Sequence, residues 1–310
     1  MLLIDSRGEI GGQLHQIPSP ITNWAGGYFE NGKAAAESLK IGLGKAMEDA
    51  ANEDSRLEIR LGSLVKRIKS VPPELKFELE LEGGEKLLAE TLVIAPGYRE
   101  RPHALEGKYR GENPFIIHHT SLREESLTDH TDDKPIAIVG GGDSALLKAL
   151  KLEKDLENIP KNDSGKEIYI IHRGASLRAR PDVIAKLHKS KRCRLILDSE
   201  VTALTEEASG CRITVQNNKN KDQQELSVCY MLVKIGYLPN TEFLQGFIRL
   251  EEDGHIKVDS DLHPYDVQGK LLANVYVVGD VLAGTTPRLA TASGQGMHAA
   301  SKIMHAASKI

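Results

Sequence analysis

The chain has 310 residues, of which 40% are hydrophobic, and a net charge of −4 at pH 7. This length allows about two domains, and the small negative charge gives no general attraction to nucleic acid or to an anionic membrane. No stretch reaches the ~18 consecutive apolar residues of a membrane span, and charged residues interrupt the start too early for a signal peptide. We therefore expect a cytoplasmic protein with no nucleic-acid or membrane partner.

The cysteines give no sign of a metal or disulfide framework. Cys193, Cys211 and Cys229 are too widely spaced for a C-x-x-C pair or a zinc pattern. We interpret them as structural thiols in a reducing compartment and expect no metal site.

The first part of the chain alternates between short apolar strands and one helix. Residues 1–5 are predicted as a strand that ends in an acid, and a loop rich in glycine follows at 6–13. Residues 33–53 carry apolar side chains at helical spacing. Glycines 83 and 84 predict a hairpin turn. Further strands are expected at 57–68, 76–82, 86–88 and 91–95.

A glycine turn dominates the middle of the chain. After a predicted linker at 128–133, an apolar strand, 136–139, runs into the turn, which opens a helix. Gly140 permits the tight bend, Gly142 lets a pyrophosphate approach the backbone, and Ala145 is small enough for close helix–strand packing. The helix N-terminus offers free N–H groups to phosphate. This G-x-G-x-x-A in its strand–turn–helix context predicts a dinucleotide site.

The next strand indicates which dinucleotide binds. Residues 168–171 form an apolar strand that ends in His172-Arg173, and Arg178 and Arg180 follow closely. An acid at this strand end usually holds the ribose 2′-hydroxyl of NAD, whereas a basic residue suits the 2′-phosphate of NADP. We therefore predict an NADP site. The alternative is a buried βαβ unit that binds nothing, with a solvated arginine-rich loop.

The rest of the chain continues the same alternation. Strands are predicted at 195–197, 212–215, 225–235 and 275–278. An alanine-rich helix is expected from about Arg288. A short repeat, 298–303 and 305–310, suits an extension of that helix with no chemistry of its own.

Six separated motifs occur in one order along the chain. They are Gly11-Gly12-Gln13-Leu14, the strand 92–95 with Pro96-Gly97, Gly140 to Ala145, His172 to Ala179, Ile235 to Thr241, and Tyr276 to Asp280 followed by 288–296. Together they resemble the low-molecular-weight thioredoxin reductase group of FAD- and NAD(P)H-dependent oxidoreductases, which includes ferredoxin/flavodoxin–NADP reductases of thioredoxin-reductase type.

The resemblance implies a fold and an organisation. The fold is α/β, with two Rossmann-like, three-layer ββα nucleotide-binding domains. The NAD(P)H-binding domain, residues 121–238, is inserted in a discontinuous FAD-binding domain formed by residues 1–120 and 239–310. Members of this group are usually homodimers, so we expect a homodimer here.

The resemblance also implies site residues. In the family, the equivalent of Asp280 holds the flavin ribityl chain, and the helix after it points its N-terminus at the isoalloxazine; the structural alternative for Asp280 is an N-cap or turn acid. The implied FAD contacts are Asp5, Gly12, Gln13, Asn23, Gly97, Asp280, Arg288, Leu289 and Ala290. The implied NADP contacts are Gly140, Gly142, Asp143, Ser144, Ala145, His172, Arg173 and Arg178.

The chain departs from the family pattern at the redox dithiol. The family's C-x-x-C precedes the second glycine motif, and the corresponding residues 116–121 contain no cysteine. Direct exchange with a thioredoxin disulfide needs a thiolate and is therefore not supported. We expect an external acceptor, either a small redox carrier (ferredoxin, flavodoxin or thioredoxin-like) or a small molecule. His118 and His119 are weak candidates for a place near the flavin; the alternative is that they are ordinary loop histidines.

A second departure concerns the FAD half. Asp5 resembles the second-strand acid that holds the adenosine ribose, yet only four residues precede it. The first strand and its glycine fingerprint, normally central in the sheet, are missing, which removes the pyrophosphate site and leaves the strands on both sides without a partner. We interpret the sequence as truncated at its start; the alternative is a remnant that has closed up and lost tight FAD binding.

The leading hypothesis is a flavin-dependent oxidoreductase that passes electrons from NADPH through FAD to an external acceptor, without an internal redox dithiol. A second hypothesis is a non-catalytic or degenerate NAD(P)-binding relative that acts as a sensor or partner. A third is an N-terminally truncated thioredoxin reductase-like protein, and a fourth is a thioredoxin reductase whose dithiol is displaced to Cys193, Cys211 or Cys229.

Overall fold

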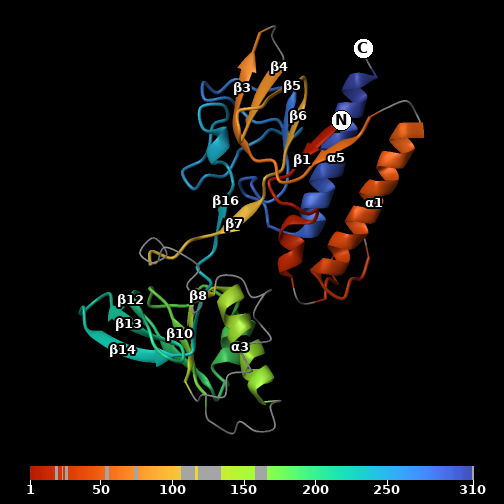
Figure 1. Cartoon of the computed structure of the whole chain (residues 1–310). Helices are drawn as coiled ribbons and strands as arrows, with labels where there is room; N and C mark the ends of the chain where they lie inside the picture. Colours follow the sequence, from red (N-terminus) through yellow and green to blue (C-terminus); the bar gives the residue numbers. More distant parts are fainter. Residues whose placement is uncertain are drawn as a thin grey trace. The chain divides into compact units, whose positions relative to one another are not determined.

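The computed structural model describes residues 1–17, 20–22, 24, 27–52, 56–72, 76–105, 116–117, 134–157 and 166–308. The chain divides into two compact units (Figure 1). Unit 1 combines the two ends of the chain, Met1–Arg99 and Leu238–Ile310, and unit 2 is the intervening Glu100–Tyr237. Unit 2 thus begins before the predicted boundary at 120 and ends next to the predicted boundary at 238. Both units combine helices with strands, so the α/β class is confirmed.

Unit 2 is built on a parallel sheet with the strand order β11-β10-β9-β15-β8. Every neighbouring pair in this sheet is parallel. Strands β9 and β15 are buried along their whole length, as expected for a parallel sheet that is covered on both faces. The five strands are β8 (Ile116–Ile117), β9 (Ile136–Val139), β10 (Ile168–Ile171), β11 (Cys193–Ile196) and β15 (Tyr230–Val233).

Two further layers cover this sheet. On one face, α3 (Asp143–Glu157) and α4 (Pro181–Leu187) join the core of β9 and β10 through residues such as Leu146 and Val183. On the other face, the side chains of Ala137 and Val139 pack with Ile213 of an antiparallel sheet. That sheet has the order β12-β13-β14 and consists of β12 (Ser199–Glu206), β13 (Cys211–Asn217) and β14 (Gln223–Val228).

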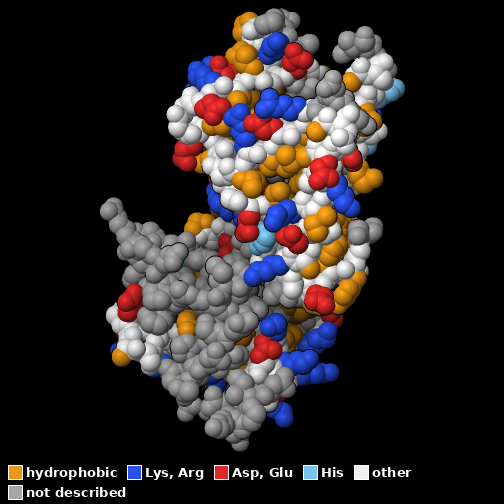
Figure 2. All heavy atoms as spheres, turned by 45° about the vertical axis from the view of Figure 1, so that its right-hand side comes forward, with side chains coloured by type: hydrophobic (Ala, Val, Ile, Leu, Met, Phe, Trp, Pro, Cys, Tyr) orange, Lys and Arg blue, Asp and Glu red, His pale blue; other side chains and the backbone are white. Residues whose placement is uncertain are grey.

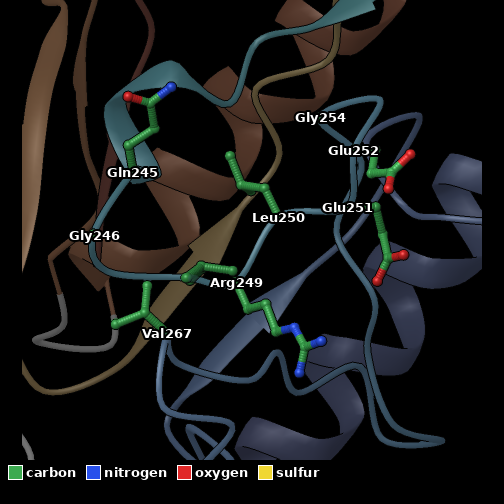
Figure 3. Close-up of a pocket in the computed structure, with 9 residues that line it drawn as sticks. Gln245, Gly246, Arg249, Leu250, Glu251, Glu252, Gly254 and Val267 are labelled. Carbon is green, nitrogen blue, oxygen red and sulfur yellow. The ribbon is translucent and has the colours of Figure 1, made fainter.

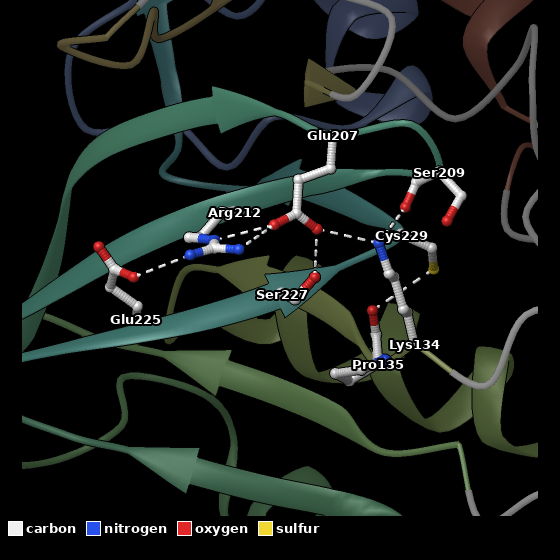
Figure 4. A network of polar contacts seen from close by, with 8 residues as sticks. All are labelled: Lys134, Pro135, Glu207, Ser209, Arg212, Glu225, Ser227 and Cys229. Atoms are coloured by element: carbon white, nitrogen blue, oxygen red, sulfur yellow. Dashed lines mark hydrogen bonds and ion pairs between the residues drawn. The ribbon is translucent and has the colours of Figure 1, made fainter.

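The start of β9 is tied to the antiparallel sheet by a polar network (Figure 4). The Glu207 carboxylate accepts hydrogen bonds from Ser227 Oγ (2.5 Å), Arg212 Nε (2.8 Å) and Lys134 Nζ (2.9 Å). Lys134 also donates to the carbonyl of Ser209. These contacts fix the segment that leads into the central strand.

One predicted strand of unit 2 is wrong. The apolar stretch 225–235 forms two strands in different sheets, because β14 ends at Val228 and β15 begins at Tyr230. Between them, the Cys229 N–H donates to the Pro135 carbonyl at the start of β9 (2.9 Å). The chain therefore passes from one layer to the next at Cys229 alone. Because this step does not interrupt the hydrophobic pattern, the sequence predicts one strand where there are two.

The parallel strands of unit 1 are divided between two small sheets. β1 (Leu2–Ile4) pairs with β2 (Glu58–Arg60), and β6 (Leu92–Ile94) pairs with β17 (Val275–Val277). The predicted strand 57–68 is also divided, because Gly62 has a φ of +65° between β2 and the next strand. A third sheet is antiparallel, with the order β3-β4-β5, and contains the predicted hairpin. Its strands are β3 (Val65–Val71), β4 (Lys76–Leu81) and β5 (Lys86–Ala89).

The two long helices of unit 1 bury little of their surface. α1 (Gly32–Asn52) buries only Gly32, Ala35 and Ala36, and α5 (Leu289–Ala307) buries only Ala299. Large apolar side chains remain exposed on both, and Figure 2 shows such side chains on one face of unit 1. These exposed residues are Leu39, Ile41, Met47, Met297 and Met304. No helix within the described ranges is long and apolar enough to cross a membrane.

Short elements complete the described chain. A 3₁₀ helix, η1 (Gly12–Gln16), follows the N-terminal loop, and another, η4 (Glu242–Leu244), begins the second segment of unit 1. The strands β7 (Tyr98–Glu100) and β16 (Tyr237–Pro239) pair with each other where the chain passes between the units.

Candidate nucleotide-binding sites

The glycine turn of unit 2 lies between β9 and α3, as predicted. Gly140 has a φ of +147°, and a Cβ at this position would lie 2.2 Å from the Lys234 carbonyl oxygen, so only glycine fits. A Cβ at Gly142 would have no protein atom within 4 Å, which leaves open space beside the turn. Ala145 is fully buried in the core that joins α3 to β9. The turn therefore has the backing and the open face that a phosphate site needs.

His172 supports the turn from within the unit. Its side chain is buried, and its Nδ1 would lie 2.5 Å from a Cβ at Gly141. Its Nε2 lies 3.1 Å from the Ser176 carbonyl oxygen. Burial lowers the pKa of His172, and the charges of Arg178 and Arg173 lower it further. The neutral ring fills the space under the turn, and a contact with the cofactor stays a prediction.

The arginines predicted to bind the 2′-phosphate are close to this turn. The Arg178 N–H donates to the Gly141 carbonyl (2.7 Å), and Arg173 follows the end of β10. Both side chains are exposed, and no carboxylate within the described ranges forms an ion pair with either. Two positive charges beside the turn are thus available to an anion.

Arg180 and Asp143 have a different role. Arg180 Nε lies 2.9 Å from Asp143 Oδ2, and the Arg180 N–H donates to Oδ1 (2.7 Å). Because Arg180 is the N-cap residue of α4, this pair connects the first residue of α3 to the start of α4. The exposed Ser144 follows Asp143 in the first turn of α3.

In unit 1, the segments predicted to hold FAD converge. Gln13 Nε2 donates to the Tyr98 carbonyl (2.6 Å), and a Cβ at the neighbouring Gly97 would lie 3.9 Å from the same nitrogen. Leu289, at the start of α5, packs in one cluster with Leu14. The predicted residues around 12–14, 97 and 289 are therefore brought together.

Arg7 connects two other predicted contacts. Its backbone N–H donates to Asp5 Oδ1 (2.9 Å), and its Nη1 donates to the Gly12 carbonyl (2.7 Å). Sequence reasoning missed Arg7, since a lone arginine in a polar loop gives no motif.

Asp280 is half-buried and has no hydrogen-bond donor among the described residues. Burial raises the pKa of this carboxyl. The preceding Gly279 donates its N–H to Gln295 Oε1 of α5 (2.8 Å), which fixes the turn against that helix. A carboxylate in this position is stabilised by any hydroxyl that donates to it.

Other predicted residues have less support. Arg288 is the N-cap residue of α5, and both it and Ala290 are exposed. Asn23, His118, His119 and the predicted linker 128–133 lie outside the described residues.

The thiols are protected by burial. Cys211 and Cys229 are buried, and Cys193 is partly buried; all three are free. Burial raises the pKa of Cys211 to about 12 and raises that of Cys193. Cys211 and Cys193 therefore stay protonated at neutral pH, whereas a redox-active thiol needs a lowered pKa.

A surface hollow in unit 1 lies apart from the predicted contacts (Figure 3). Its lining comes from residues 245–254 together with Val267 and contains none of the predicted FAD or NADP residues. Its charged side chains, Arg249, Glu251 and Glu252, are exposed and of mixed sign. The hollow therefore gives no argument for a cofactor.

A parallel sheet with a glycine turn, arginines beside it and a second α/β unit define a nucleotide-binding oxidoreductase. The model of the pyridine nucleotide-disulphide oxidoreductase family matches residues 8–296, and the chain belongs to this family. The family comprises flavoprotein oxidoreductases and typically binds FAD and NAD(P)H.

Named relatives are similar over part of their length. The chain is 30% identical over 233 residues to the "34.2 kDa protein in rubredoxin operon" of Clostridium pasteurianum, covering 72% of this chain and 69% of that protein. It is 29% identical over 222 residues to the thioredoxin reductase of Chlamydia trachomatis (70% and 65%). The match to thioredoxin reductase of Streptomyces coelicolor, 29% identical and covering 54% of this chain, spans about half (48%) of that protein.

Solved structures support the fold over the whole chain. The thioredoxin reductase of Lactococcus lactis has a TM-score of 0.74 at 20% identity and covers 100% of this chain and 91% of that one. The thioredoxin reductase of T. acidophilum has a TM-score of 0.72 at 20% identity, with 99% and 90% covered. At these identities the likeness concerns the fold.

Proposed function

We propose that the chain is an oxidoreductase that passes electrons from NADPH through FAD to an external acceptor without an internal dithiol. In this proposal unit 2 is the NADPH-binding domain, inserted in an FAD-binding unit 1. One observation carries it: in each unit, charged side chains at the predicted cofactor contacts have no partner among the described residues. Arg173 and Arg178 lie beside the glycine turn in unit 2, and Asp280 has no hydrogen-bond donor among the described residues of unit 1.

The residues of unit 2 fit NADPH. The open face at Gly142 and the N–H groups of the first turn of α3 suit a pyrophosphate, since a helix N-terminus carries partial positive charge. Arg173 and Arg178 suit the 2′-phosphate, which a charge-assisted hydrogen bond stabilises by about 1.5–3 kcal/mol.

The residues of unit 1 fit one end of FAD. The Asp280 carboxylate would accept from a ribityl hydroxyl, and the N-terminus of α5 would stabilise negative charge next to it. Gln13 and Gly97 frame the same region. When bound, FAD supplies the transfer of electrons between a two-electron donor and the acceptor. We assign no described residue of unit 1 to the pyrophosphate end of FAD.

The acceptor in this proposal is external. Cys211 and Cys229 are buried, and burial raises the pKa of Cys211 and of the partly buried Cys193, so these thiols are poor nucleophiles for a disulfide exchange. We propose a small redox carrier of the ferredoxin, flavodoxin or thioredoxin-like class, or a small molecule, as the recipient of the electrons.

The test compares two sets of arginines in unit 2. The protein is incubated with FAD, and ferricyanide reduction is measured with NADPH and with NADH. We expect a yellow protein in which the double variant Arg173→Ala, Arg178→Ala raises the KM for NADPH about 10- to 100-fold and changes that for NADH little. The matched control is Arg194→Ala, which removes an exposed arginine that pairs with Glu167. An equal rise in the KM for NADPH and for NADH would contradict a site that is specific for NADP.

The divided parallel sheet of unit 1 favours a second candidate, a relative that binds a nucleotide without catalysis. A colourless protein that takes up no FAD yet binds NADPH through Arg173 and Arg178 would select this function. NADPH-dependent dye reduction by the FAD-loaded protein excludes it.

A further inference from the structure

Tyr98, His255 and Asp253 form a line of polar contacts inside unit 1. The Tyr98 hydroxyl is hydrogen-bonded to Nε2 of His255, and the two rings meet edge to face with their centroids 5.6 Å apart. Nδ1 of His255 lies 2.9 Å from Oδ1 of Asp253. The angle of this contact departs from regular hydrogen-bond geometry, yet the contact is the largest cause of the lowered pKa of Asp253. The side chains are 22% exposed at His255 and 70% exposed at Asp253, so the line ends in water.

The turn that carries His255 is fixed on both sides. On one side, Thr241 Oγ1 donates to the Gly254 carbonyl (2.8 Å). On the other, the N–H of the residue after His255 donates to the carbonyl of Val281 (2.9 Å), which follows Asp280. The backbone therefore brings His255, whose ring binds the Tyr98 hydroxyl, next to the segment that contains Asp280.

The charges around the line define which groups hold protons. Burial raises the pKa of Tyr98, and the negative charges of Asp280 and Asp253 raise it further, so the phenol keeps its proton. The His255 ring, and then the His255 backbone N–H, lower the pKa of Asp253, which stays ionised. The carboxylate favours the His255 tautomer with a proton on Nδ1, which leaves Nε2 to accept from the Tyr98 hydroxyl. The contacts thus run from the Tyr98 hydroxyl, which donates, through the His255 ring to the Asp253 carboxylate, which accepts.

We propose that Tyr98, His255 and Asp253 form a proton path between the site beside Asp280 and solvent. The proposal rests on the proposed function. Oxidation of NADPH to NADP⁺ releases two electrons and one proton, and a one-electron carrier takes only the electrons. The remaining proton passes to the Tyr98 oxygen while the hydroxyl proton moves to Nε2 of His255, and the Nδ1 proton moves to Asp253 and then to water. Tyr98 and His255 act as relay and positioning residues.

A first experiment examines the path without any cofactor. The absorbance of the Tyr98 phenolate is titrated as the difference between the wild type and Tyr98→Phe, in the apo protein. We expect Asp253→Asn to lower the pKa of Tyr98, because it removes a negative charge that opposes the phenolate. Glu252→Gln, which neutralises an exposed acid of the same turn, leaves the titration unchanged. An identical Tyr98 titration in wild type and Asp253→Asn overturns the proposal.

A second experiment uses the FAD-loaded protein. Reduction by NADPH is followed in a single turnover, and steady-state ferricyanide reduction is measured in H₂O and D₂O. We expect Tyr98→Phe and Asp253→Asn to slow ferricyanide reduction about 100-fold, the low end of the ~10²–10⁴-fold range for positioned proton transfer. Reduction by NADPH stays within about twofold, because hydride transfer needs no proton from solvent. Tyr265→Phe is the matched control.

The outcomes separate the path from the proposed function. If the wild type transfers electrons and both variants match it in rate and solvent isotope effect, the path is wrong and the proposed function stands. If NADPH does not reduce the wild type, the proposed function is wrong, and the apo titration alone decides whether the contacts between Tyr98, His255 and Asp253 operate as proposed.

Discussion

The strands of the two units follow each other in the same order along the chain. The units differ in one strand, β9 of unit 2, which has no counterpart among the described strands of unit 1. In unit 2, β10, β11, the antiparallel sheet and β15 follow each other along the chain, and β9 lies between β10 and β15. In unit 1, β1, β2, the antiparallel sheet and β6 follow in the same way. There, β1 and β6 belong to separate sheets, and no described strand pairs with both.

The side chains show what the central strand contributes. Ile136 of β9 and Leu232 of β15 have no exposed surface, whereas Leu2 of β1 is 37% exposed and Val93 of β6 is 52% exposed. A single strand therefore supplies pairing for two neighbours, covers apolar surface on both sides and carries the turn that meets a phosphate. Among the described residues of unit 1, the strands around this position are present, and the proposed contacts to FAD lie around Asp280, Gln13 and Gly97.

The largest expected effect is a loss of stability in unit 2 after a substitution in its glycine turn. Gly140→Val places a side chain where the Lys234 carbonyl oxygen lies and forces a non-glycine residue to a φ of +147°. Overpacking and strained backbone each cost about 1–3 kcal/mol, so we expect unit 2 to lose about 2–6 kcal/mol of stability in urea unfolding. Gly142→Ala, in open space, is the control and leaves the unfolding midpoint unchanged. A normal midpoint for Gly140→Val would show that the turn is not packed against Lys234.

The next prediction concerns a strand added to unit 1. We extend the chain ahead of Met1 by a strand, a G-x-G-x-x-G turn and a helix patterned on residues 136–157. Covering Leu2 and Val93 should raise the stability of unit 1 by about 1–3 kcal/mol, since full burial of such a side chain contributes about 1.5–3 kcal/mol and these two are only partly exposed. FAD affinity should rise with it, as measured by equilibrium dialysis. An extension with the glycines of the turn replaced by valine keeps the length and should give neither gain.

The smallest effect concerns the anchor of β9 and depends on pH. Contacts with Ser227, Lys134 and Arg212 lower the pKa of Glu207 from 4.5 to about 2. Because the pKa in the folded state is lowered, the stabilisation is fully present above about pH 4.5 and is lost as the pH falls toward 2. Glu207→Gln should therefore lower the melting temperature slightly at pH 7, and the difference from wild type should disappear near pH 2. Glu225→Gln, which removes a more exposed partner of Arg212, is the control, with a smaller shift at pH 7.

Local signals explain what the sequence could predict. The strand 168–171 and the strand–turn–helix around Gly140 agree with the structure, because burial on both faces and a required glycine leave a clear pattern. The helices α1 and α5 were also predicted near their bounds from their spacing and composition. In contrast, β12 and α4 were not predicted, since their patterns are mixed and their burial depends on partners elsewhere.

The residues of the candidate sites also differ in whether a local sequence pattern marks them. Gly140 and Ala145 were found from spacing alone, and the tight turn and the buried packing agree with it, whereas a pyrophosphate contact at Gly142 stays a prediction. Tyr98 and His255 were missed, because 157 positions separate them and only the fold brings the hydroxyl to the ring. A sequence motif records neighbours along the chain and cannot record such a pair.

The position of the thiols has a practical consequence. Cys193, Cys211 and Cys229 all belong to unit 2, and two of them are buried, so unit 1 contains no cysteine at all. An alkylating reagent reaches the buried pair only when unit 2 opens, because a shielded, protonated thiol does not react. The rate at which Cys211 and Cys229 are labelled therefore measures how often unit 2 opens. Unit 1 contributes nothing to this signal.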